Sequence, residues 1–171
     1  MSRGEISQVF VYIMVVIVFA VVFLFGYRAI NHFVAEGEKV AFITFKNDIE
    51  DAIKSVEFGS VNVYHAERPL RVPSKYTKVC FIDFDTAKNL NVPCTGLSVS
   101  ACDALKSKGS GWEGAESNVF LTPEGLLPIK VYRIRLKNKN GQPVPTLCIP
   151  TAGRLDMRLT GQGTHTVISP N

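Results

Sequence analysis

One uncharged run constrains the fold of this chain more than any other feature. It extends from Ile6 to Tyr27, and its 22 residues carry no charged side chain (ISQVFVYIMVVIVFAVVFLFGY). As an α-helix the run is about 33 Å long, enough to cross a hydrocarbon core of about 30 Å. Val, Ile and Phe favour strands in water, but in lipid only a helix satisfies its backbone groups within one segment. The sequence therefore predicts a membrane-spanning helix.

A cleaved secretory signal is the main alternative for this run. Such a signal has an apolar core of about 7 to 15 residues, followed by a cleavage site made of small residues. The run here is longer, and the four residues Phe25-Gly26-Tyr27-Arg28 contain no Ala-x-Ala pattern. We therefore expect the helix to remain in the mature protein.

The residues that follow continue a helical pattern to about Phe58. At 100° per residue, apolar side chains lie on one side of the helix and charged side chains on the other. No proline occurs before Pro69, so one continuous helix is expected, with Gly26 and Gly37 as places for a bend. This stripe is expected to pack against the rest of the chain, and its members are Phe42, Phe45, Ile49, Ala52, Ile53 and Val56.

From Ser60 onward, short β-rich runs alternate with Pro, Gly and Asn, which predicts a sheet or a sandwich. Together with the helix this gives an α+β fold, in which a membrane span and its amphipathic extension pack against an antiparallel β-rich head. The expected strands cover residues 61–64, 77–84, 118–121, 129–136, 146–149, 155–160 and 164–168, with helical turns at 85–90 and 102–108.

The charge of the chain does not indicate a nucleic-acid partner. The net charge is +4, and basic and acidic residues are scattered along the sequence. Five cations do lie between Lys130 and Lys139, but Tyr132, Ile134 and Leu136 alternate with them. We interpret these cations as the solvent side of a half-buried strand. Similarly, Gly161-Gln162-Gly163 is interpreted as a hairpin turn, because no βαβ unit surrounds it.

All four cysteines follow the apolar run. Their spacings of 14, 8 and 46 residues lack the paired Cys-x-x-Cys pattern of a zinc site, so two disulfides are favoured. Local closure suggests Cys94 with Cys102, which leaves Cys80 to pair with Cys148; the other two connectivities stay open. The positive charges beside the span do not favour a cytoplasmic N-terminus, but disulfides favour a head that faces outward.

Catalytic and metal-binding patterns are missing from the sequence. No Ser, Cys or Thr lies in a recognisable nucleophile motif, no carboxylate pair is presented at a motif, and the three histidines have no ligand spacing. We therefore expect neither an enzyme nor a cofactor, and a membrane-anchored enzyme ranks third among the functional classes.

The residues before the apolar run resemble a specific processing site. Arg3-Gly4-Glu5-Ile6, directly ahead of an apolar helix, is similar to the prepilin-peptidase site of archaeal type IV pilin-like proteins, with Ser7 at the third mature position. The resemblance implies cleavage between Gly4 and Glu5 by a prepilin-peptidase-like enzyme, with the helix retained. It also implies a long helix whose outer half carries a β-rich head.

Four segments follow from this resemblance: a leader at 1–4, a span or filament-core helix at 5–30, an amphipathic extension at 31–58 and an extracellular head at 59–171. The expected function is that of a pilin or minor pilin, a structural or adhesive subunit of a surface filament that assembles through its N-terminal helices. The N-terminus would be cytoplasmic. The alternative is a single-pass anchored protein that never polymerises and binds a partner or ligand with its head.

Overall fold

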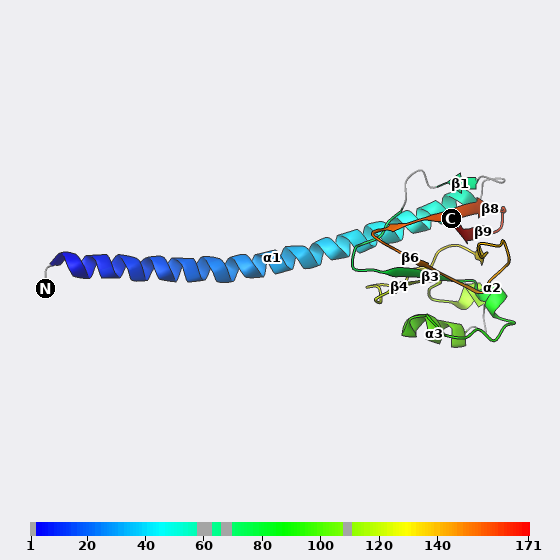
Figure 1. Cartoon of the computed structure of the whole chain (residues 1–171), viewed down its shortest axis with the longest axis horizontal. Coiled ribbons are helices and arrows are strands. Elements are labelled where there is room, and N and C mark those ends of the chain that lie inside the picture. The colour runs from blue at the N-terminus through cyan, green and yellow to red at the C-terminus, as the bar shows by residue number, and fades with distance from the viewer. Residues whose placement is uncertain (1–2, 58–62, 66–69, 108–110) are drawn as a thin grey trace. The chain divides into compact units, whose positions relative to one another are not determined.

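The structure is a computed structural model that describes residues 3–57, 63–65, 70–107 and 111–171, with side chains left undescribed at 3–8, 35, 57 and 63–65. It contains one long helix, α1 (Arg3–Glu57), followed by a β-rich region (Figure 1). The expected α+β fold is therefore confirmed.

The chain divides into two compact units, Met1–Val40 and Ala41–Asn171. The boundary lies inside α1, so the expected segment 31–58 is shared between the units. The expected boundary between residues 58 and 59 lies outside the described residues, as do Met1, Ser2 and the first half of the expected strand 61–64.

The second unit contains the end of α1, three short helices and nine strands among its described residues. The helices are α2 (Phe84–Ala87), α3 (Val99–Lys106) and α4 (Gly111–Gly114). The strands are β1 (Val63–His65), β2 (Leu70–Arg71), β3 (Lys78–Ile82), β4 (Val119–Thr122), β5 (Ile134–Leu136), β6 (Thr146–Pro150), β7 (Arg154–Leu155), β8 (Met157–Gly161) and β9 (Thr166–Pro170).

The strands form three sheets with the orders β1-β8-β9-β5, β2-β7 and β4-β3-β6. Every pair is antiparallel except β5 with β9, which run parallel. The expectation of an antiparallel head is therefore wrong at this pair. A parallel pair needs a long connection, and residues 137–165 supply one that includes three other strands.

The sheet β4-β3-β6 separates two hydrophobic clusters. Val79 and Phe81 on β3 belong to the larger cluster, which also contains the buried residues of α1. Cys80 and Ile82, which alternate with them, belong to a smaller cluster that contains Ala101 and Leu105 of α3. The side chains of a strand point alternately to opposite faces, so β3 contributes to both clusters.

The expected strand 129–136 is only partly present. Ile129 and Val131 are buried, but regular pairing covers only Ile134–Leu136. The Asn118 side chain accepts a hydrogen bond from Val131 N at 2.8 Å and donates one to Val131 O at 3.2 Å. The Asn118 side chain thus takes the place of a neighbouring strand as the hydrogen-bond partner of the Val131 backbone. The alternation shifts after Val131, and Tyr132, which we expected to be buried, is 39% exposed.

The hairpin expected at Gly161-Gln162-Gly163 is confirmed. It joins the antiparallel strands β8 and β9, and Gln162 N donates a hydrogen bond to His165 O at 3.0 Å. Gly163 has φ +78°, a conformation that glycine adopts without steric cost. This turn places His165 just before β9.

Candidate functional site

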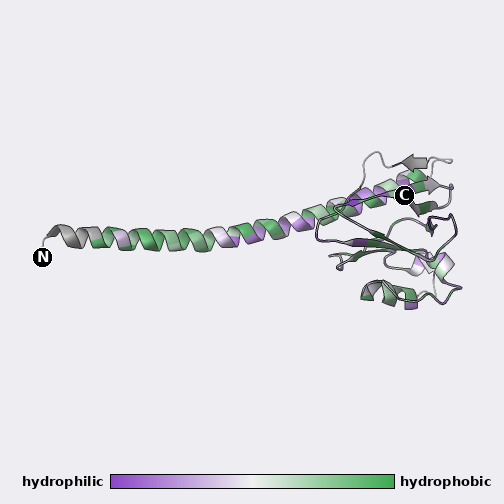
Figure 2. Ribbon diagram, viewed as in Figure 1, coloured by the Kyte–Doolittle hydropathy of each residue, from purple (hydrophilic) through white to green (hydrophobic). Residues whose placement is uncertain are grey.

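The first unit presents an apolar helix surface with no cover from the described residues. Large apolar side chains from Val9 to Val34 are between 45% and 75% exposed, and they lie on all sides of α1. Figure 2 shows hydrophobic colouring along this part of the helix and more hydrophilic residues further on. Soluble monomers rarely expose a contiguous apolar surface of this size. The surface is therefore the main candidate functional site.

The length and composition of α1 also indicate that its apolar surface is the main candidate functional site. Within the described residues, α1 is the one helix that is long and apolar enough to cross a membrane, with a mean hydropathy of 3.1 in its most apolar window. The Gly4-Glu5 peptide bond lies in the first turns of this helix. The expected span is thus present as a helix.

Gly26 and Gly37 lie in this helix without a packing reason among the described residues. A Cβ atom added at Gly26 or Gly37 would meet no atom within 4 Å. Glycine in a helix interior costs about 1 kcal/mol relative to alanine. Neither glycine is therefore required by a contact with another part of the described chain.

Five of the six stripe residues on α1 lie in the core of the second unit, and the sixth, Ala52, is partly buried against it. The exposed fractions of the five are 0% to 3%, and they belong to the larger hydrophobic cluster: Phe42, Phe45, Ile49, Ile53 and Val56. Gly125 makes room for the first of these, since a Cβ atom at Gly125 would lie 2.9 Å from Phe42 Cε2. The sequence pattern identified the helix side of this contact but not Gly125.

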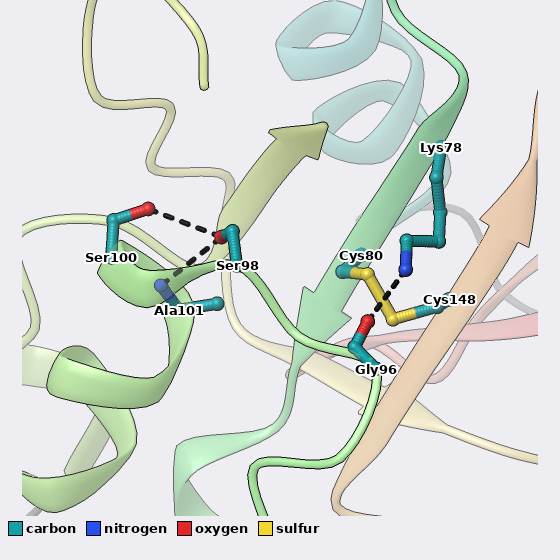
Figure 3. Close-up of a disulfide and its surroundings, with 7 residues drawn as sticks. All are labelled: Lys78, Cys80, Gly96, Ser98, Ser100, Ala101 and Cys148. Atoms are coloured by element: carbon teal, nitrogen blue, oxygen red, sulfur yellow. Dashed lines mark hydrogen bonds between the residues drawn. A yellow bond between two sulfur atoms is a disulfide. The ribbon is translucent and has the colours of Figure 1, made fainter. Parts of the chain in front are cut away.

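One disulfide lies in the smaller cluster, and a second joins α3 to the segment before it. Cys80 lies opposite Cys148 in the register of β3 and β6, and the two are bonded (Figure 3). Cys94 is bonded to Cys102 in the first turns of α3. These are the two pairs that local closure suggested. The nearby Ser98 caps α3, because its hydroxyl accepts a hydrogen bond from Ala101 N at 3.3 Å.

Two of the cations assigned to the solvent side of a strand are partly exposed, and they also pair with buried or half-buried acids. Arg135 Nη1 lies 3.3 Å from Oδ2 of Asp83, which is only 2% exposed. Arg133 Nε donates a hydrogen bond of 2.7 Å to Asp85 Oδ2. The sequence pattern does not reveal this network, because the acids and the arginines lie about 50 residues apart. An Asp three residues before Thr86 does fit a helix N-cap, and Asp83 caps α2.

The pKa of Asp85 is set by opposing effects. Burial raises the pKa, but the hydrogen bond from Arg133 and the charge of Arg133 outweigh it, assisted by a backbone N–H of Trp112 and by Arg135. The pKa of Asp85 is therefore lowered, and its carboxylate is ionised at neutral pH. The carboxylate thus neutralises part of the basic charge around it.

Comparisons with protein-family models, with curated proteins and with solved structures found no match for this chain. Among the described residues, no three His, Cys, Asp or Glu side chains come together as metal ligands.

Proposed function

We propose that this protein is a pilin-like structural subunit, anchored in the membrane by α1 and assembled with other copies into a surface filament. The observation that carries the proposal is the extent of exposed apolar surface on the first unit. Exposed apolar side chains continue beyond Tyr27 at Ile30, Phe33, Val34 and Val40, with exposed fractions of 58% to 75%.

A bilayer does not cover this whole length. From Ile6 to Val40 the helix extends about 51 Å, whereas a hydrocarbon core is about 30 Å thick, or about 40 to 45 Å with its headgroup regions. A single anchored chain would leave several apolar side chains in water. Neighbouring copies of the same helix would cover them, because van der Waals packing between helices can replace contacts with lipid.

The remaining features agree with this function. Arg3-Gly4 precedes the apolar run at the spacing of a prepilin-peptidase site, so a leader would be removed and the apolar run kept. The two disulfides favour an oxidising compartment, and thus an extracellular head and a cytoplasmic N-terminus. The packed stripe on α1 would fix the head to its own helix in each subunit.

Microscopy of two matched variants tests the proposal. Phe33→Ser removes an exposed apolar side chain, and Asn31→Ser introduces the same residue at an exposed polar position nearby. In sheared surface material probed with antibody to the head, we expect filaments from wild type and Asn31→Ser and far fewer from Phe33→Ser. All three should enter the membrane equally. If wild-type protein stays entirely in the membrane fraction, the non-polymerising anchor is the correct function.

A further inference from the structure

A second candidate site lies in the head, apart from the helix surface. A cavity of about 360 Å³ opens between β5, the β8–β9 hairpin and the start of α2. Polar side chains reach it from all three elements: Thr86, Arg135, Lys137, Gln162 and His165. Its volume is within the range of cavities that bind small molecules.

The acids at this cavity are already neutralised. Asp83 accepts hydrogen bonds from the backbone N–H and the hydroxyl of Thr86, and it pairs with Arg135. Asp85, close by, pairs with Arg133. Among the residues that line the cavity, one acid, Asp83, therefore faces two cations, Arg135 and Lys137, and the lining carries a net positive charge when His165 is neutral.

Several donors at the cavity remain available. Lys137 is exposed, and its ammonium group forms no hydrogen bond or ion pair with any described residue. His165 uses Nδ1 in a 3.0 Å hydrogen bond with Thr164 Oγ1, which leaves Nε2 without a partner in the described part of the chain. The Gln162 side-chain amide is likewise exposed beside it.

We propose that this cavity binds a carboxylate-bearing sugar, with the carboxylate on Lys137 and Arg135 and the hydroxyl groups on Gln162 and His165. A carboxylate satisfies the unpaired ammonium group, and charge-assisted hydrogen bonds of this kind are stronger than neutral ones. The cavity is larger than a simple ion requires, and Pro143 and Val167 add apolar surface for the face of a ring. This binding activity would be separate from filament assembly.

The proposal includes a pH dependence. Burial lowers the pKa of His165, and so do the charges of Arg135 and Arg133, while Asp83 and Asp85 act in the opposite direction. Lys137 also lines the cavity. A bound carboxylate favours the protonated imidazole, so binding takes up a proton. The pKa of His165 in the unbound protein lies below its ordinary value of 6.5, so affinity should rise as the pH falls from neutral toward this lowered pKa.

Calorimetry with full-length protein in a neutral detergent tests the proposal, with glucuronate as the probe. Glucose and sulfate are the comparison ligands. We expect saturable binding of glucuronate, little binding of glucose and weaker binding of sulfate. Equal affinity for sulfate and glucuronate would overturn the sugar-acid assignment in favour of a simple anion site, and no saturable binding of glucuronate would overturn the site.

Substitutions of residues that line the cavity test whether glucuronate binds there. Lys137→Gln should weaken glucuronate binding roughly five- to tenfold. Lys139→Gln removes a nearby exposed cation that does not line the cavity, and it should have little effect. His165→Asn should flatten the pH dependence. Equal losses in the two lysine variants would mean that general charge, not this cavity, attracts the ligand.

Discussion

The Thr166 hydroxyl donates a 3.0 Å hydrogen bond to the carbonyl oxygen of Ile53. Thr166 begins β9 and Ile53 lies near the end of α1, so the bond joins two elements 113 residues apart. Both residues are completely buried. The bond links the sheet to the backbone of the helix at the place where the apolar stripe packs.

Replacing Thr166 by valine keeps the shape of the side chain but removes this bond. Thr166→Val should lower the free energy of unfolding by about 1 kcal/mol, since Ile53 O loses one partner in a buried site. The measurement is chemical denaturation of a fragment from Ala35 to Asn171, which includes the whole second unit. Thr164→Val, at an exposed site, should change stability by less than about 0.5 kcal/mol. Equal effects would mean that the bond does not stabilise the fold.

The apolar stripe should contribute far more than this single bond. Phe45 is 1% exposed, and Phe45→Ala should destabilise the same fragment by about 3 to 5 kcal/mol through lost burial and an unfilled cavity. Asp48→Ala, on the exposed side of the helix, should stay within about 0.5 kcal/mol. If the two variants were equally stable, α1 would not be part of the core of the head.

The two disulfides should differ in their effects. Removing the Cys80–Cys148 bond by a double alanine substitution releases a 68-residue separation, and removing Cys94–Cys102 releases only 8. Chain entropy predicts losses of about 4 and about 2 to 3 kcal/mol, respectively. Chemical denaturation of the two double variants gives the free energy of unfolding of each, and thus shows which disulfide stabilises the fold more. Protein taken from cells should also show no alkylatable thiol, and four reactive thiols would contradict both the bonds and the outward-facing head.

Local periodicity made the helix predictable. The stripe from Phe42 to Val56 depends on a repeat of 3.6 residues, and this repeat can be read directly from the sequence. The shift in the alternation of buried and exposed side chains at Tyr132 could not be read in the same way. It depends on the hydrogen bonds that the Asn118 side chain accepts from and donates to the backbone of Val131, 13 residues away. A prediction from the alternating pattern assumes that a neighbouring strand forms hydrogen bonds with the N–H and C=O groups of Val131.

The charged network and the cavity beside it could also not be predicted from the sequence pattern. Arg133 and Arg135 alternate with apolar residues as a solvent-facing side would, but they pair with Asp85 in α2 and with Asp83, the N-cap of α2. That contact depends on the tertiary fold. The disulfide pairs were easier, because four cysteines allow only three connectivities.

The Asp85–Arg133 pair should make stability depend on pH in the acid range. The pKa of Asp85 in the folded protein is lowered below its ordinary value of 3.8, so its contribution is complete above about pH 4 and is lost as the pH falls through the folded-state pKa. Asp85→Asn should cost at most about 1 kcal/mol at pH 7, since Arg133 is 46% exposed.

Denaturation of the fragment between pH 7 and pH 2 measures this dependence. The difference between wild type and Asp85→Asn should shrink below about pH 4, whereas Asp48→Asn, at an exposed position on α1, should follow wild type throughout. A difference that stays constant down to pH 2 would show that ionisation of Asp85 is not its source.

Processing of the N-terminus is expected to follow the Arg3-Gly4 pair. The mature chain should begin at Glu5 and keep the apolar helix, because a prepilin-peptidase-like enzyme cuts before the span rather than after it. Intact-mass measurement of protein from its native membrane decides this, and Gly4→Leu is the matched variant in which cleavage should fail. A native chain that still carries Met1 through Gly4 would favour the non-polymerising anchor, and one that begins beyond Tyr27 would identify the run as a secretory signal.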